Sequence, residues 1–404
     1  MRLTLVNQFY APDISPTAQL AASLAEHRAD RGDEVTVITG RAGYLEELAR
    51  TGAARAGPGL RIRRVWTPHL GKSSLWRRLV GYVTFLVGGT ARLLALPAQD
   101  VIVSMTTPPF IVTSAVLHKL LHRGRPRVVL WSMDCYPDAA ERFGELRPDG
   151  TLSRLQRRLN RWLFPRLDHV VALDGAMAEL LSSQYAAGPG RPPTRVIPNW
   201  ERRSAFPPPG TVPPWSGYDD LAIDGRIVVL YLGNTGVGHR FDSVLEAAGK
   251  LQDEAVLLFM GGGARWAALA EAVEDRGLRN VVLHPYVPKD VTPAVMAGAD
   301  GALITLDDRS LGVMSPSKLH ANLAAGLPIV YVGPEGSNVD EAIAGTGSGH
   351  SLREGDVDGI VSAIRSLRTD PTVRVHARTA FEERYADTAT LAQWDAVIEG
   401  TTGS

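Results

Sequence analysis

Short apolar runs rich in Val, Ile and Leu alternate along this chain with longer segments of helical periodicity. Continuous apolar runs of this length are typical of parallel strands buried on both faces, with the helices as crossover connections. The pattern therefore predicts an α/β fold built on parallel sheets. Strands are expected in one series near Leu3–Val6, Glu34–Thr39, Val101–Ser104, Val128–Trp131 and His169–Leu173, and in a second near Ile227–Leu232, Ala255–Met260, Val281–Leu283, Gly301–Thr305 and Ile329–Val332.

The two series predict two doubly wound, Rossmann-like domains, one over residues 1–200 and one over residues 226–385. The chain between them is dense in Pro and Gly and lacks a periodic element, so we expect a linker at 201–225. A final helix within 386–404 contains Trp394, whose large apolar surface needs a partner. We expect this helix to pack back onto the first domain.

One segment is almost apolar enough to cross a membrane. Residues 79–97 carry only Thr84, Thr90 and Arg92 as polar side chains, and Trp76-Arg77-Arg78 precedes them. Glycines and the arginine within the segment weaken a spanning interpretation, and a buried or interfacial helix fits better. Peripheral contact with the inner face of a membrane therefore stays open.

Composition narrows the function classes. The 404 residues include 43 basic and 43 acidic side chains, so we expect no nucleic-acid partner. The single cysteine, Cys135, excludes an internal disulfide and a multi-cysteine metal site, and the first apolar run is too short for a signal peptide, which together favour the cytoplasm. HExxH, GxSxG and Walker lysine motifs are absent, so no metal and no cofactor is expected.

The stretch from Gly312 to Val330 is the most informative one, because it predicts a loop that opens a helix and then enters another buried strand. Ser315, Ser317 and the free N–H groups of the first helical turn converge at the positive end of the helix dipole, and Lys318 adds a full charge. A phosphate is the natural ligand of such a site. The alternative is an ordinary Ser-Pro-Ser cap on a surface helix.

Other strand ends of the second series offer similar groups. Gly233-Asn-Thr-Gly236 leads to Arg240, the glycines after Met260 lead to Arg265, and Tyr286 lies in a loop whose backbone could pair with the edge of a base. Ligands of open parallel sheets bind beyond the carboxyl ends of the strands, so these loops and Ser315–Lys318 together indicate a nucleoside diphosphate site. Each loop taken alone could be an ordinary tight turn, and its arginine could simply be solvated.

Two histidines of the second series, His239 and His320, are interpreted as lining or surface residues rather than as ligands.

The first series has no such phosphate cassette. Asp13, Ser15 and Thr17 lie between the first strand and its helix, and Thr107-Pro108 forms part of a stiff loop after a later strand. Asp134 follows another strand and is the only acidic candidate for contact with an acceptor hydroxyl. A capping or solvated aspartate is the alternative.

These motifs resemble those of bacterial GT-B glycosyltransferases of family 4, nearest the branch that builds colanic-acid-type exopolysaccharides and O-antigens. The matching pieces span nearly the whole chain: Tyr10–Gln19, Asp134–Asp138, Ile197–Trp200, Gly233–Gly236, Pro316–Leu319 and Leu323–Pro328. The resemblance implies two Rossmann-like domains facing a cleft, with the sugar nucleotide in the C-terminal domain and the acceptor, often with a membrane surface, at the N-terminal one. It also implies transfer with retention and without a metal.

Carried onto this sequence, the resemblance implies that Arg240 and Lys318 neutralise the diphosphate leaving group. The expected catalytic residues are Arg240, Lys318 and Asp134. The expected donor-binding residues are Gly233, Asn234, Thr235, Gly236, Gly262, Arg265, Tyr286, Ser315, Ser317, Leu319 and Asn322. The expected acceptor-binding residues are Asp13, Ser15, Thr17, Thr107 and Pro108.

The sequence departs from the wider family at several positions. Two glutamates that mark many members correspond to Val313 and Ala321, so Asn322 or a neighbouring backbone group is expected to replace the contact with the ribose. Asn234 stands where many members have an arginine, and Ser15-Pro16 stands in place of a glycine pair. These differences bear on the identity of the donor more than on the fold.

We therefore expect a retaining, metal-independent hexosyltransferase that uses a UDP-sugar or a GDP-sugar. Its acceptor is a lipid-linked saccharide or a small natural product. One alternative is a sugar-nucleotide 2-epimerase of the same architecture, which needs a pair of acid/base carboxylates that the sequence does not clearly offer. The other is an inactive nucleotide-binding partner protein.

Overall fold

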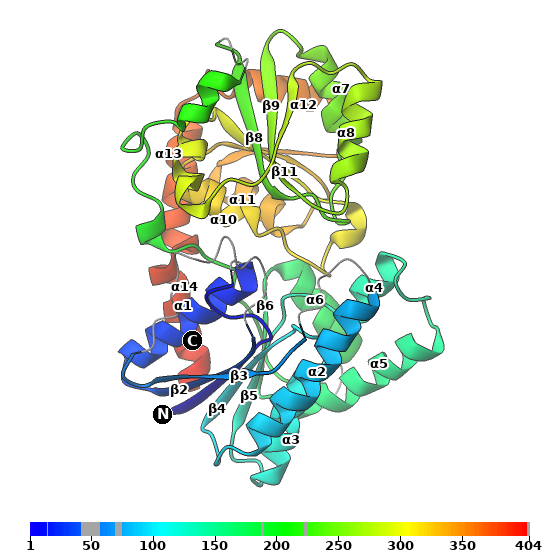
Figure 1. Cartoon of the computed structure of the whole chain (residues 1–404), viewed down its shortest axis with the longest axis vertical. Helices are drawn as coiled ribbons and strands as arrows, with labels where there is room; N and C mark the ends of the chain where they lie inside the picture. The colour runs from blue at the N-terminus through cyan, green and yellow to red at the C-terminus, as the bar shows by residue number, and fades with distance from the viewer. Residues whose placement is uncertain are drawn as a thin grey trace. The chain divides into compact units, whose positions relative to one another are not determined.

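The computed structural model describes residues 1–13, 15–41, 57–68, 75–186, 190–221, 223 and 225–401, with only the backbone for 75–78. The chain divides into two compact units (Figure 1). The first comprises Met1–Pro198, Gly312–Met314 and Leu391–Ser404, and the second comprises Asn199–Leu311 and Ser315–Thr390. Each contains one parallel β-sheet, so the expected pair of Rossmann-like domains is confirmed. Linker positions 222 and 224 and the tail at 402–404 lie outside the described residues.

The first unit is built on a seven-stranded sheet with the order β3-β2-β1-β4-β5-β6-β7. Strand β1 (Arg2–Val6) lies between β2 and β4, where Leu3 pairs with both Val35 and Val101. The other strands are β2 (Glu34–Gly40), β3 (Leu60–Val65), β4 (Val101–Met105), β5 (Arg127–Trp131), β6 (His169–Ala172) and β7 (Thr194–Val196). The order reverses direction at β1, as expected for a doubly wound sheet.

The helices of the first unit connect successive strands. They are α1 (Pro16–Asp30), α2 (Leu75–Leu94), α3 (Val112–Leu121), α4 (Asp138–Arg142), α5 (Thr151–Leu163) and α6 (Gly175–Tyr185). The apolar segment of the sequence is α2, in which Phe85 and Leu93 are buried while Val83 and Val87 are exposed. No helix in the described part of the chain is long and apolar enough to cross a bilayer.

The second unit is built on a six-stranded sheet with the order β10-β9-β8-β11-β12-β13. Its strands are β8 (Ile227–Asn234), β9 (Ala255–Gly262), β10 (Val281–His284), β11 (Gly301–Thr305), β12 (Ile329–Val332) and β13 (Gly349–Leu352). Its helices are α7 (Asp242–Lys250), α8 (Trp266–Asp275), α9 (Thr292–Ala297), α10 (Lys318–Ala324), α11 (Asn338–Thr346), α12 (Val357–Ser366) and α13 (Thr372–Ala380), the last continuing as a π-helical turn at Phe381–Tyr385.

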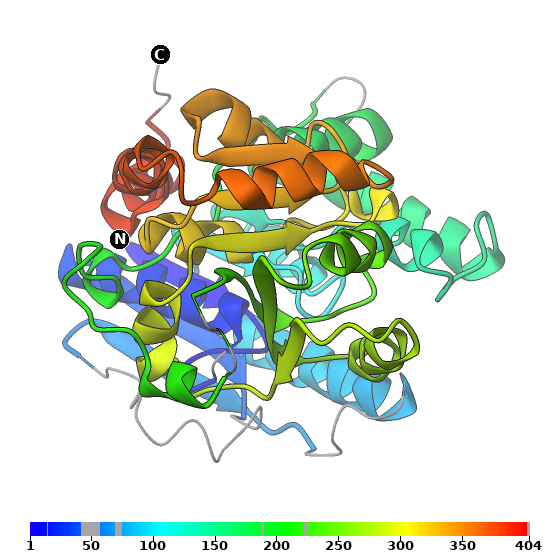
Figure 2. The same cartoon turned by 90° about the horizontal axis from the view of Figure 1, so that it is seen from above.

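Helices cover both faces of this sheet (Figure 2), and each face has its own hydrophobic core. Alternate residues of β8 divide between the cores: Val228 and Leu230 pack with α9, α10 and α11, whereas Val229 and Tyr231 pack with α7 and α12. A strand buried on both faces cannot alternate apolar with polar residues, which explains the continuous apolar run in the sequence.

Three strands escaped the sequence analysis, and all lie at the edges of their sheets. In β3 the ends Leu60 and Val65 are buried, but Arg61 and Arg63 lie between them. Strand β7 has only three residues, and β13 reads Gly-His-Ser-Leu. An edge strand is only half covered, so it does not need the apolar run on which the prediction relied.

The final helix α14 (Asp387–Glu399) ends in the first unit. Trp394 is fully buried there, and its ring centroid lies 4.5 Å from that of Trp131 at the end of β5. Arg28 of α1, only 3% exposed, contacts Asp395 and Glu399 of α14, each at 2.7 Å, as well as Asp33. An aromatic contact and an ion-pair network therefore hold the end of the chain.

Replacement of Trp394 by Ala should destabilise the first unit by about 3–5 kcal/mol, because it removes a large buried ring and leaves a cavity beside Trp131. Thermal and urea unfolding of the variant test this. The matched control is Trp66→Ala, since Trp66 is 62% exposed and should change the unfolding free energy by less than about 0.5 kcal/mol. Equal effects of the two substitutions would contradict the packing described here.

Candidate functional site

The candidate site of the second unit begins where β8 turns into the loop before α7. Gly233 has a φ of +127°, a conformation that side chains rarely adopt, and a Cβ there would lie 3.2 Å from Cε of Lys318. The missing side chain therefore lets the lysine stem pass over the strand end. This is a close approach of the kind for which a glycine is required.

The adjacent end of β9 fixes this loop through backbone contacts. Thr235 N–H donates to the carbonyl of Gly262 over 2.8 Å, and Arg265 N–H donates to the carbonyl of Thr235 over 2.9 Å. A Cβ on Gly263 would collide with the side chain of Asn234. Thr235 is fully buried and its hydroxyl donates to Gly262, so its side chain supports the loop and does not face a ligand.

Lys318 is the first residue of α10, and its ammonium is surrounded by neutral groups. Nζ lies 3.1 Å from the carbonyl oxygen of Asn234, 3.2 Å from Nε2 of His239 and 4.6 Å from the centroid of the Tyr231 ring. No carboxylate of the described residues comes within ion-pair distance of Nζ. Loss of hydration lowers the pKa of Lys318 from 10.5 to about 7. The Lys318 ammonium therefore has only neutral partners among the described residues, and this environment favours binding of an anion.

Arg240 has a different environment from Lys318. Its Nη2 lies 3.7 Å from Asp242 and 4.0 Å from Glu354, and its side chain is 41% exposed. Its charge is therefore shared with two carboxylates. The structure brings the Lys318 ammonium to the carbonyl of Asn234, and the expected roles of Arg240 and Lys318 at a diphosphate stay predictions.

Arg265 is a second cation of this region, and its charge acts on the same histidine as the charge of Lys318. Its positive charge helps to depress the pKa of His239, the same ring that contacts Lys318. Within the described ranges, no acidic side chain pairs with the Arg265 guanidinium. Lys318 and Arg265 thus form a positively charged edge at the carboxyl ends of β8 and β9.

The loop before α10 contributes hydroxyl groups to the same strand-end region. Ser317 occupies the N-cap position of α10, but no side-chain hydrogen bond caps the helix. Ser315 and Ser317 are both partly exposed. The ordinary Ser-Pro-Ser cap considered from the sequence is therefore not formed, and the Ser317 hydroxyl is not used on its own helix.

Two other predicted donor residues of α10 point into the protein. The Leu319 side chain is fully buried in the core with α11 and α13, so only its backbone could meet a ligand. Asn322 is 4% exposed. The contact with a ribose predicted for Asn322 is not tested by this geometry and stays a prediction.

Tyr286 presents an exposed aromatic face beside the loop of β9. Its side chain is 50% exposed, and a Cβ on Gly262 would lie 3.3 Å from its ring. Glycine at 262 therefore makes room for the tyrosine ring. A flat exposed ring suits stacking with a base.

The candidate acceptor residues all belong to the first unit. Asp13 is 4% exposed and lies in the loop after β1, and the hydroxyls of Ser15 and Thr17 lie 3.4 Å apart at the start of α1. The carbonyl of Thr107, which precedes Pro108, accepts the backbone N–H of Gln8 over 2.9 Å. The loops after β1 and β4 are therefore joined, as adjacent strand ends should be.

Asp134 follows β5 in the same sheet. Its backbone N–H donates to the hydroxyl of Thr106 over 3.2 Å, which ties it to the loop after β4. Desolvation raises the pKa of the Asp134 carboxyl from 3.8 to about 6. A carboxyl with a pKa near neutrality is suited to accept a proton from a hydroxyl.

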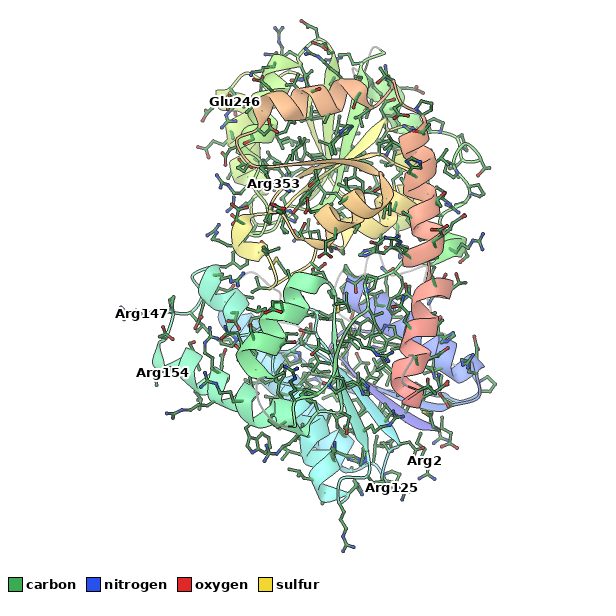
Figure 3. All side chains as sticks on the ribbon, turned by 180° about the vertical axis from the view of Figure 1, so that it is seen from behind. Arg2, Arg125, Arg147, Arg154, Glu246 and Arg353 are labelled. Carbon is green, nitrogen blue, oxygen red and sulfur yellow. The ribbon has the colours of Figure 1, made fainter. Side chains whose placement is uncertain are left out.

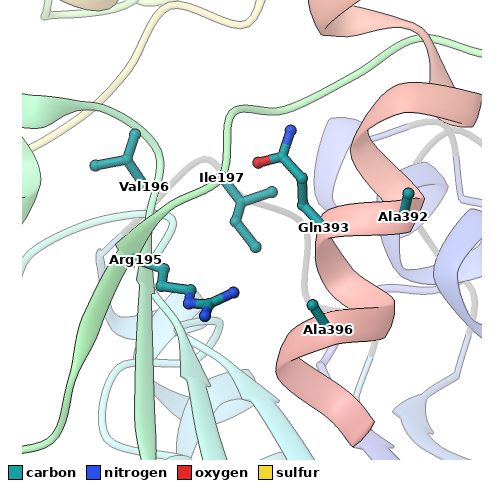
Figure 4. Close-up of a pocket in the computed structure, with 6 residues that line it drawn as sticks. All are labelled: Arg195, Val196, Ile197, Ala392, Gln393 and Ala396. Atoms are coloured by element: carbon teal, nitrogen blue, oxygen red, sulfur yellow. The ribbon is translucent and has the colours of Figure 1, made fainter. Parts of the chain in front are cut away.

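A cavity of about 400 Å³ lies elsewhere in the first unit, between β7 and α14 (Figure 4). Arg195 and Ile197 line it from the strand side, and Gln393 and Ala396 line it from the helix. None of the residues predicted to act in donor or acceptor binding lines this cavity. We therefore assign it no part in the candidate site.

His239, which the sequence analysis interpreted as a lining or surface residue, has contacts that the sequence did not indicate. Its ring is held between the carbonyl of Thr305 and the ammonium of Lys318. Nothing in the local sequence distinguishes it, because its partners come from β11 and α10. Among the described side chains, no group of three or more His, Cys, Asp or Glu could hold a metal ion.

The sequence of this chain is similar to those of known glycosyltransferases. The sequence model of the "Glycosyl transferase 4-like domain" matches residues 17–200. WbjE of Pseudomonas aeruginosa is 28% identical over 274 residues, which cover 66% of each chain, slightly less than two thirds. WcaI of Escherichia coli K12 is 24% identical over 81% of this chain and 82% of its own. Both are named as glycosyltransferases, WcaI in colanic acid biosynthesis, so the epimerase alternative is not favoured.

Solved structures share the fold over the whole chain. Sucrose-phosphate synthase from Thermosynechococcus elongatus superposes with a TM-score of 0.73 at 13% identity, covering 98% of both chains. Anabaena HepE in complex with UDP-glucose gives a TM-score of 0.70 at 14% identity, covering 99% of this chain and 100% of its own. These identities establish the fold alone, which is GT-B.

The unusual environment of Lys318 can be measured directly by acylation of amines at a series of pH values. Only a neutral amine reacts, so labelling of Lys318 should reach half its maximum near pH 7, as its lowered pKa requires. Lys250 is the matched control, since its hydrogen bond to Asp358 raises its pKa above 10.5. Peptide mass spectrometry reads both sites. A common midpoint for the two lysines would contradict the environment assigned to Lys318.

Proposed function

Because residues 17–200 of this chain match the glycosyl transferase 4-like domain model, we propose that the protein transfers a sugar from a UDP-sugar or a GDP-sugar to a lipid-linked saccharide or a small natural product. The observation that carries the proposal is the Lys318 ammonium, held at the strand ends of the second unit without a carboxylate partner. A diphosphate supplies the negative charge that this environment lacks.

The same charge explains how transfer would be accelerated. The bond between the anomeric carbon and the diphosphate breaks, and negative charge grows on the departing phosphate oxygen. A fixed cation at that oxygen stabilises the transition state more than the ground state, without any reorganisation. Lys318 is the proposed cation, with the Ser315 and Ser317 hydroxyls as further donors. The proposed reaction retains the anomeric configuration by attack on the same face and needs no metal or enzyme nucleophile.

Two observations support the proposal that the sugar is carried by a nucleoside diphosphate. HepE, which has the same fold, is solved with UDP and with UDP-glucose. In this chain, the Tyr286 ring is exposed and lies against Gly262 at the end of β9. We propose that the base stacks on Tyr286 and that Arg265 assists Lys318 at the phosphates.

The acceptor is proposed to bind at the first unit. Asp13, Ser15, Thr17, Thr107 and Pro108 supply its contacts, and Asp134 accepts the proton of the attacking hydroxyl. The support for this role is the raised pKa of Asp134, about 6. A base with this pKa is ionised at neutral pH and is still basic enough to assist a hydroxyl.

Membrane contact is proposed for the face formed by α2, α3 and α5 of the first unit, which we call the basic apolar face. Helix α3 contacts both α2 and α5. The described exposed apolar side chains of this face are Leu79, Val80, Val83, Val87, Leu117, Leu120, Leu121, Leu152, Leu155 and Trp162. The Trp76-Arg77-Arg78 side chains, which the sequence analysis placed at its start, lie outside the described residues.

The charge of the basic apolar face complements an anionic lipid surface. None of the three helices contains Asp or Glu, whereas α5 alone contributes Arg154, Arg158 and Arg161 to the exposed surface. The Arg154 side chain points away from the unit (Figure 3). Apolar side chains flanked by arginines are the combination that holds peripheral proteins at anionic bilayers.

Calorimetry with UDP and GDP tests the donor assignment. The unmodified protein should bind at least one of them, and Lys318→Ala should weaken that binding at least tenfold, because it removes a cation whose charge no described carboxylate shares. Arg240→Ala is the matched comparison and should weaken binding less, since Asp242 and Glu354 already share its charge. Failure of the unmodified protein to bind either nucleotide would refute the proposed function.

Flotation with lipid vesicles tests the basic apolar face. The protein should float with phosphatidylcholine vesicles that contain about one third phosphatidylglycerol, and less with phosphatidylcholine alone. The double variant Val87→Glu/Leu155→Glu should reduce the bound fraction several-fold, because it places carboxylates on the face. Val375→Glu is the control, since Val375 is 64% exposed on α13 of the second unit. Equal binding by all three proteins would exclude this face as the membrane contact.

A further inference from the structure

The ring of His239 lies at the strand ends of the second unit in a single defined orientation. Its Nδ1 is 2.7 Å from the carbonyl oxygen of Thr305 at the end of β11. The Tyr231 ring meets it at 90° with centroids 5.8 Å apart, and the Phe241 ring stacks on it at 6.3 Å. These contacts come from β8, β11 and the start of α7, so the imidazole cannot turn without losing several of them.

This orientation determines which nitrogen carries the proton. A carbonyl oxygen only accepts hydrogen bonds, so Nδ1 must be the protonated nitrogen. The other nitrogen, Nε2, then presents a lone pair, and it lies 3.2 Å from Nζ of Lys318. The ammonium therefore donates to the imidazole. A second proton of Nζ is directed to the carbonyl of Asn234 at 3.1 Å, which leaves a third for a ligand.

The neutrality of this acceptor matters as much as its position. Burial, together with the charges of Lys318 and Arg265, lowers the pKa of His239 from 6.5 to about 3, so the imidazole stays uncharged at physiological pH. A carboxylate in its place would also fix the lysine, but it would cancel the positive charge. A neutral acceptor fixes the ammonium and leaves its whole charge available to an anion.

We propose that His239 is a positioning residue that aims the Lys318 ammonium at the diphosphate of the donor. This inference rests on the proposed function. His239 acts through the lysine: it holds Nζ between the loop after β8 and the start of α10, so that the remaining N–H points to the phosphate and little side-chain entropy is lost on binding.

The test compares His239→Gln, His239→Glu and His239→Phe by calorimetry with UDP and GDP. Gln retains a neutral acceptor near the position of Nε2 and should bind the nucleotide within about threefold of the unmodified protein. Phe retains the ring packing against Tyr231 and Phe241 but has no acceptor, and should bind about tenfold more weakly. Glu has the same shape as Gln with a negative charge, and should weaken binding most.

A merely structural role predicts a different order. If His239 only fills space between Tyr231 and Phe241, Phe should be the mildest replacement, and Gln and Glu should be equally harmful. Either result would overturn the proposal. If His239→Phe does not fold, as judged by thermal unfolding, the Gln and Glu variants decide the matter between them, since they differ only in charge.

Two controls separate this inference from the proposed function. His350→Phe removes another histidine of the second unit, whose Nε2 lies 3.0 Å from the Ser366 hydroxyl, and should leave nucleotide binding unchanged. Absence of UDP and GDP binding in the unmodified protein refutes the donor assignment itself. Binding that depends on Lys318 but is equal in all three His239 variants refutes the role of His239 alone.

Discussion

An ammonium group held by neutral partners is the feature around which the second unit is arranged. Lys318 is kept at the ends of the strands by a carbonyl, an imidazole and an aromatic face, and none of these cancels its charge. Such an environment is costly for a cation, which is why the pKa of Lys318 falls to about 7. An anionic ligand relieves this cost, so the free protein is already organised for the charge it is proposed to bind.

Backbone geometry makes this arrangement possible. Parallel strands bring the loops after β8, β9 and β11 to one edge, and the crossover helices supply the residues that meet there. Gly233 leaves space for the lysine stem, and Gly263 leaves space for the side chain of Asn234. These two glycines thus make room for the protein's own side chains.

The fold was largely predictable from the sequence because its central strands are buried on both faces. The continuous apolar runs of β8 and β12 predicted strands of a parallel sheet that is covered on both faces. The edge strand β3 contains arginines and was not predicted. The candidate site was harder to predict from the sequence than the fold. Loop composition indicated Gly233 and Lys318, but the partners of a side chain depend on three-dimensional contacts. The local sequence therefore did not indicate the contact between His239 and Lys318. It also did not predict the carboxylates that lie beside Arg240.

The Lys318 ammonium, aimed by His239, is proposed to contact the diphosphate of the sugar donor. A crystal structure of the protein with UDP tests it most directly. We expect a phosphate oxygen within hydrogen-bonding distance of Nζ of Lys318, with Nε2 of His239 still accepting from the same ammonium. A diphosphate bound away from Lys318 would refute the proposed contact, and a Lys318 ammonium that loses its hydrogen bond to His239 on binding would refute the role of His239.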